Sequence, residues 1–255
     1  PNNPLTARVI VNRVWSLFFG RGLVATPSNF GQLGSPPSHP ELLDDLSVRF
    51  MENNWSIKWL VRELVLSSTY QQLSQNKLQN ELIDPANIYL WRMNRRRLSV
   101  EQWRDSILAA SNNLDRRGGE SLELTDAKNV HRTVYGRVSR KKLNDILMQF
   151  DYPDANVHSA KRSVTTTAIQ KLFMINSSFM VEQAKRLAKR ITGDSSATDL
   201  THIQSTYALL YNRKPTRKET DLGLAFLRLP EEGKLTRWEQ YSHALLAANE
   251  MIFID

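Results

Sequence analysis

The chain of 255 residues contains no cysteine. Without thiols it cannot form a disulfide, a thiolate metal site, a cysteine nucleophile or a covalently attached c-type haem. It also has no run of 18 apolar residues. The richest apolar stretch, residues 7–19, is interrupted by Arg8, Asn12, Arg13 and Ser16. The sequence therefore predicts no membrane span.

The spaced motifs of common active sites are missing as well. There is no phosphate-binding Gly-x-x-x-x-Gly-Lys loop, no Gly-x-Ser-x-Gly elbow and no dinucleotide-binding Gly-x-Gly-x-x-Gly after a strand. No histidine stands three or four positions from another, which zinc-binding helices require. We therefore predict no metal site and no cofactor in this domain, and the catalytic residues, if any, stay unknown. The scattered histidines are His39, His131, His158, His202 and His243.

Apolar residues recur at helical spacing along most of the chain. Hydrophobic residues make up 41% and charged residues 24%, which is typical of an ordered globular protein. Asn3-Pro4 and Gly20 are start and stop signals for a first helix over residues 4–19. We predict an all-α fold: a multi-helix bundle of about nine or ten helices, with long ordered loops and at most one short β-hairpin or strand pair.

Three segments match the capping box, in which Ser or Thr is followed three residues later by Glu or Gln. They are Ser99–Gln102, Thr216–Glu219 and Thr236–Glu239. Two further expectations are a strand over residues 131–138, the only stretch that reads as one, and a helix over residues 141–150.

Length permits one large domain or two small ones. We predict a single helical domain over residues 1–255. A bilobal arrangement is the alternative, with an N-terminal lobe over residues 1–150 and a C-terminal helical lobe over residues 151–255.

The N-terminal part contains a long loop, residues 20–40, with four glycines and four prolines. Loops of this length without secondary structure are uncommon and often functional. We favour an ordered wrap that covers the core through Leu23, Val24 and Phe30.

The formal charge is +8, and most of the excess lies in one segment. Residues 86–142 hold 13 Lys and Arg against 6 Asp and Glu. Such a balance permits binding to nucleic acid or another anion. No helix-turn-helix or RNA-recognition signature accompanies it, and we interpret Trp91 and Trp103 as core residues, so nucleic acid is an unlikely partner.

Four arginines precede the helix that the Ser99 capping box begins. A helix N-terminus is electropositive, so cations there need compensation. Glu101 and Asp105 are the nearest carboxylates, and we favour internal pairing for at least two of the last three arginines. An arginine left unpaired on a concave surface would be a candidate for ligand binding. The four are Arg92, Arg95, Arg96 and Arg97.

A second polar cluster follows the predicted helix over residues 141–150. Its oxygen atoms could bind a hard cation such as calcium, but the glycine and distal glutamate of an EF-hand loop are missing. We favour a hydrogen-bonded turn. With the arginines, this cluster completes our set of candidate ligand-binding residues: Arg95, Arg96, Arg97, Asp151, Asp154 and Asn156.

Seven ordered blocks cover nearly the whole chain. They are NPLTARVIVNRVWSLFFGRGLVATPSNFG, PPSHPELLDDL, LVLSSTYQQ, WRMNRRRLSVEQWRDSILAAS, FDYPDAN, TTTAIQKLFMINSSFMVEQA and SHALLAANEMIFID. Together they resemble the planctomycete domain-of-unknown-function family 1553. The resemblance implies the C-terminal module of a large exported protein with cytochrome-type domains, and hence an extracytoplasmic location, periplasmic or at the cell surface. No catalytic residue comes with it.

Three hypotheses for function follow. The leading one is an interaction or docking module that works beside neighbouring domains of the parent polypeptide, among them a c-type cytochrome domain. The alternative is binding or processing of an anionic polymer, such as a glycan, in a basic cleft where loop 20–40, residues 94–97 and residues 151–154 meet. Nucleic-acid binding is the third.

Overall fold

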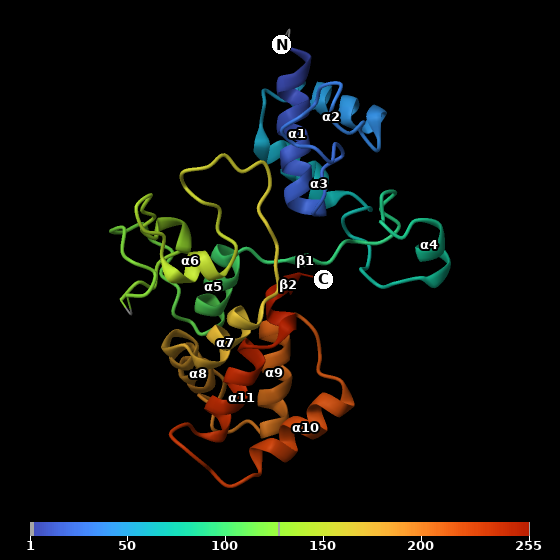
Figure 1. Cartoon of the computed structure of the whole chain (residues 1–255). Coiled ribbons are helices and arrows are strands. Elements are labelled where there is room, and N and C mark those ends of the chain that lie inside the picture. Colours follow the sequence, from blue (N-terminus) through green and yellow to red (C-terminus); the bar gives the residue numbers. More distant parts are fainter. Residues whose placement is uncertain (1–2, 127, 255) are drawn as a thin grey trace. The chain divides into compact units, whose positions relative to one another are not determined.

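The computed structural model describes residues 3–126 and 128–254, of which about half are helical. Eleven α-helices and one pair of two-residue strands occur in this part of the chain (Figure 1). The predicted all-α class is therefore confirmed. The helices are α1 (Pro4–Phe19), α2 (Pro40–Glu52), α3 (Ile57–Leu66), α4 (Leu78–Ile83), α5 (Val100–Ala110), α6 (Asp145–Gln149), α7 (Ala168–Asn176), α8 (Ser178–Ile191), α9 (Asp199–Tyr211), α10 (Arg217–Leu227) and α11 (Arg237–Leu246); the strands are β1 (Arg96–Arg97) and β2 (Phe253–Ile254).

The chain divides into two compact units. Unit 1 runs to Arg96, and unit 2 runs from Arg97 to Ile254. The bilobal alternative placed the division after residue 150, whereas residues 97–150 belong to unit 2. The physical reason is that α5 and α6 bury their apolar faces in the core that α8 and α11 also form.

Unit 1 is built on α1, which packs against α2 and α3. Its core centres on Val11, Phe19, Phe50 and Leu60, each at most 1% exposed. Helix α1 begins at the Asn3 cap and ends at Gly20, as predicted.

The loop over residues 20–40 is held by a buried amide. The Asn12 side chain, 0% exposed, accepts a hydrogen bond from the Val24 N–H at 2.8 Å and donates to the Val24 carbonyl at 3.0 Å. Leu23 and Val24 are buried and Phe30 packs at the edge of the core. The predicted wrap is confirmed, and one polar side chain on α1 fixes it.

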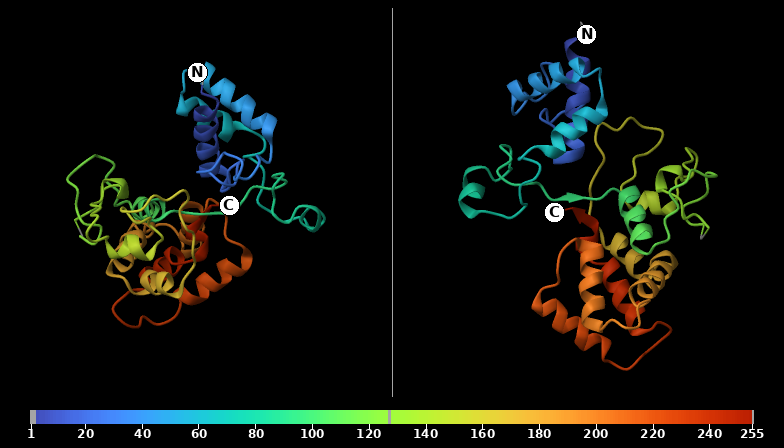
Figure 2. Two further views of the ribbon diagram at one scale, coloured as in Figure 1. Left: turned by 45° about the horizontal axis from the view of Figure 1, so that its top comes forward. Right: turned by 180° about the vertical axis from the view of Figure 1, so that it is seen from behind.

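In unit 2, α8 packs along α11, and α9 lies beside both (Figures 1 and 2). Trp103 of α5 is 1% exposed and stacks on Phe150 with 4.6 Å between ring centroids. All three predicted capping boxes form, at the starts of α5, α10 and α11. Each satisfies two backbone donors that a helix N-terminus leaves open.

One local prediction in unit 2 is wrong, and a second gives a helix that is too long. Residues 131–138 contain no strand; a 3₁₀ turn, Thr133–Tyr135, lies there instead. The cause is tertiary: the buried Arg104 side chain donates to the Thr133 hydroxyl, and Asp105 accepts from the Thr133 N–H at 2.7 Å. The helix expected over residues 141–150 is also shorter, because Asn144 caps α6 and starts it at Asp145.

None of the helices in the described part of the chain is both long enough and apolar enough to cross a lipid bilayer.

Replacement of Asn12 by Ala tests the attachment of loop 20–40. The substitution leaves the buried N–H and C=O of Val24 without partners, and we expect a loss of roughly 2 to 4 kcal/mol in the free energy of unfolding. Urea denaturation measures it. Ser16→Ala, which removes a hydrogen bond to the Arg13 carbonyl on the same helix, is the control. Equal, small losses in both variants would contradict this role of Asn12.

Candidate functional site

Arg96 binds to the C-terminal end of α1. Its guanidinium donates to the Leu17 carbonyl, and a Cβ added at Gly20 would lie 3.4 Å from its side chain. The Asn94 amide donates to the Phe19 carbonyl at 3.0 Å. Gly20, at φ +79°, ends the helix and leaves these carbonyls open. A cation is favoured at this electronegative end.

Arg97 is part of a different, buried network in unit 2. Its side chain is 6% exposed and donates to the Gln170 side-chain oxygen at 2.9 Å. The Asp151 carboxylate lies 3.6 Å from the guanidinium. Burial lowers the pKa of Arg97, and the charge of Asp151 opposes that shift.

Gln170, 2% exposed, is the centre of this network. Its oxygen also accepts from the Thr167 N–H at 3.1 Å, and its amide donates to the Gln149 carbonyl at 2.7 Å. It forms a fourth capping box with Thr167 at the start of α7. Gln170 is not among the residues predicted from the sequence, although Thr167-x-x-Gln170 has the capping-box spacing that predicted the other three.

Asp151 connects the network to the chain before α7. It adopts φ +60° and accepts from both the N–H and the hydroxyl of Thr165, at 2.8 and 2.7 Å. These bonds bring the two ends of the segment 152–164 together. Figure 1 shows that segment as the long loop between α6 and α7.

The other two members of the second cluster form a surface turn. The Asp154 carboxylate accepts from the backbone and the side-chain amide of Asn156, at 2.9 and 3.0 Å, and both residues are exposed. The Asn156 amide also donates to the Arg140 carbonyl at 3.1 Å. No group of three or more metal-binding side chains gathers among the described residues.

The structure therefore divides the candidate set into separate places. Arg97 and Asp151 meet in unit 2, Asp154 and Asn156 form the nearby turn, and Arg96 binds within unit 1. Arg95 is exposed. The proposed cleft of the glycan hypothesis draws on segments of both units and stays a prediction.

For Arg96 and Arg97, the structure shows other partners than the expected Glu101 and Asp105. Glu101 accepts two hydrogen bonds from Arg162, both at 2.8 Å, and Asp105 binds Thr133 and Arg132. Arg96 and Arg97 are bonded internally, but chiefly to a carbonyl and an amide rather than to carboxylates on α5.

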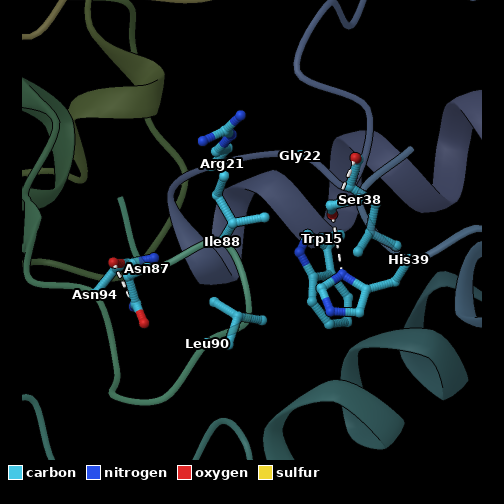
Figure 3. A pocket seen from close by; sticks show the side chains of 10 residues that line it. Trp15, Arg21, Gly22, Ser38, His39, Asn87, Ile88, Leu90 and Asn94 are labelled. Carbon is cyan, nitrogen blue, oxygen red and sulfur yellow. Dashed lines mark hydrogen bonds between the residues drawn. The ribbon is translucent and has the colours of Figure 1, made fainter. Parts of the chain in front are cut away.

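A small cavity lies in unit 1, with Asn87 and Asn94 on one side and Ser38 and His39 on the other (Figure 3). The side chains within each pair are hydrogen-bonded, at 2.9 and 3.0 Å. The volume is about 20 Å³, which is room for one water molecule and for no organic substrate.

A larger cleft of about 570 Å³ lies where α1 and α2 begin. Its walls are mixed: Phe30 and the prolines of loop 20–40 contribute apolar surface, and Gln32 and Ser35 contribute polar groups. The charges that line it, on Arg8 and Asp44, pair with each other at 2.6 Å. The two charged side chains that line this cleft therefore neutralise each other.

Comparison with known proteins gives one match. The model of the family described as PSD1, a protein of unknown function (DUF1553), matches residues 1–227. No curated protein and no solved structure matches the chain.

Loss of Asp151 and loss of Arg97 should have unequal effects on the free energy of unfolding. Asp151→Ala leaves a buried guanidinium without its carboxylate and loses the bonds to Thr165, so we expect a cost of about 2 to 4 kcal/mol. Arg97→Met removes the buried charge itself, while Gln170 and Asp151 keep their other donors. It should cost less than about 1 kcal/mol.

Urea unfolding of the two variants checks this order, with the exposed Asp154→Ala as the control. A cost for Arg97→Met that equals or exceeds that of Asp151→Ala would show that the guanidinium is a net stabiliser, contrary to this account.

Proposed function

Because the chain belongs to the DUF1553 family, a family of unknown function, we propose that it is an interaction module of an exported, multidomain protein. It docks beside a c-type cytochrome domain of the parent polypeptide. Its own role is to bind a neighbour rather than to catalyse a reaction.

The main support for this proposal is that some basic residues are bonded within their own unit while others are exposed and form no ion pair in the described part of the chain. The arginines that looked most like an anion clamp, Arg96 and Arg97, are engaged with groups of their own unit. Five other cations of the basic segment are exposed and form no ion pair with any described residue. They are Arg116, Lys128, Arg140, Lys141 and Lys142.

Polar contacts in unit 2 also support a docking function. The basic segment lies against α5 because Arg104, 1% exposed, donates to the backbone carbonyls of Asn129 and His131. A buried guanidinium therefore fixes the backbone next to Lys128, one of the exposed cations. Preorganised surface charge favours fast and specific association with a partner of opposite charge.

Binding of the 255-residue chain to the purified c-type cytochrome domain of its parent protein tests this function. Isothermal titration calorimetry should show a saturable complex whose dissociation constant rises with salt, since exposed charges are screened. No complex at low salt would contradict the proposal.

Catalysis is tested separately. A panel of glycans, esters and peptides should show no turnover that depends on Arg96. The contrary result is turnover that is lost in Arg96→Ala while the circular dichroism and unfolding of the variant are unchanged. It would show that the chain is an enzyme and not a docking module.

A further inference from the structure

We infer that the docking surface of this module is a pair of basic loops in unit 2 and that its partner is an acidic polypeptide. The loops are residues 136–144, before α6, and residues 152–164, after it; together they are called the basic loop pair. The inference rests on the proposed docking function and names its site and the chemistry of the partner.

The basic loop pair is strongly cationic. It contains six Lys and Arg residues and one carboxylate, Asp154. Two of the cations are neutralised, Arg137 by Glu123 at 3.7 Å and Arg162 by Glu101 at 2.8 Å. The remaining four are exposed and form no ion pair among the described residues: Arg140, Lys141, Lys142 and Lys161.

Asn156 joins the two loops. Its amide donates to the Arg140 carbonyl, in the middle of the first loop, and to Asp154 in its own loop. The hydrogen bond to Arg140 places the basic tract beside the turn of the second loop. The single carboxylate of the pair is thereby engaged internally.

Both loops are also fixed at their ends. Asp151 and Thr165 close the second loop, and the buried Arg97 and Gln170 lie behind them. Asn144 ends the first loop by capping α6. Fixed loops lose little conformational entropy on binding, so the cations are presented in a preorganised arrangement.

Exposed apolar side chains favour a protein partner. Val138, Val157 and Val164 are 44%, 65% and 66% exposed and lie in the same loops as the lysines. Phosphates and bases contact cations and aromatic rings, and single strands are held by stacking. Tyr152, the one Phe, Trp or Tyr of the loop pair, is covered by the Arg162 guanidinium 5.0 Å from its ring centre, and the other ring of the pair is the imidazole of His158. A carboxylate-rich polypeptide with apolar side chains fits this surface better than a nucleic acid.

The test uses three probes: poly-L-glutamate, a thymidine oligonucleotide and the c-type cytochrome domain of the parent protein. The loop variant is Lys141→Glu with Lys142→Glu. The matched control is Lys214→Glu with Lys218→Glu, which makes the same change of net charge at exposed positions just before α10 and in its first turn. We expect about tenfold weaker binding of poly-L-glutamate by the loop variant and less than about twofold by the control.

Equal weakening in both variants would mean that net charge alone drives binding and would overturn the inference. Tighter binding of the oligonucleotide than of poly-L-glutamate, lost in the loop variant, would overturn the class of partner.

The cytochrome domain separates this inference from the proposed function. If that domain binds all variants equally, the proposed docking function is supported, but the loop pair is not the docking surface. If the cytochrome domain binds none of the variants while poly-L-glutamate still distinguishes them, the loop pair is supported as a binding surface, but the cytochrome domain is not its partner.

A neutral variant tests the joining of the loops. Asn156→Ala keeps the net charge but releases the first loop from the second, and we expect about threefold weaker binding of poly-L-glutamate. Asn53→Ala, which removes a comparable side-chain bond to the Arg49 carbonyl in unit 1, should bind as the parent chain does. Unchanged binding by Asn156→Ala would show that the loops act independently and would overturn the composite surface.

Discussion

A guanidinium group that leaves water must find acceptors for its N–H donors, and this requirement organises the molecule. Arg96 finds the C-terminal carbonyl of α1, and Arg97 finds Gln170 and Asp151. Arg104 finds the carbonyls of residues 129 and 131, and Arg190 finds the last carbonyls of α5. Arg96, Arg104 and Arg190 bond to backbone carbonyls of other segments, and Arg97 bonds to polar side chains, so these arginines connect segments that lie far apart in the sequence.

The same requirement distinguishes the arginines with a structural role from the cations that can bind a partner. Arginines that are committed to internal acceptors are unavailable to a ligand. Exposed cations that form no ion pair among the described residues include Arg140, Lys141, Lys142 and Lys161. Arg97 illustrates the relation: its side chain is 6% exposed, and it lies beside Asp151, which closes the second of the basic loops. A residue predicted from sequence to bind a ligand thus supports the surface that we propose for docking.

Local signals in the sequence were sufficient for much of the fold. The Ser99 capping box, the Asn3 cap and Gly20 depend on neighbours within a few positions, and each forms as expected. The partners of Arg96 and Arg97 lie 79 and 73 positions away, and spacing carries no information about such contacts. The strand expected over residues 131–138 was lost for the same reason, because Arg104 and Asp105 bind Thr133 from α5. Gln170 was the one site residue that its local pattern could have revealed.

The central claim is that the module binds through its basic loop pair while the Arg96 and Arg97 region stays internal. Hydrogen exchange of the 255-residue chain, measured with and without the c-type cytochrome domain, tests it most directly. The account predicts slower exchange on binding across residues 136–144 and 152–164 and no change over residues 94–97 or 20–40. Protection over residues 20–40 and 94–97, with the loop pair unchanged, would contradict it.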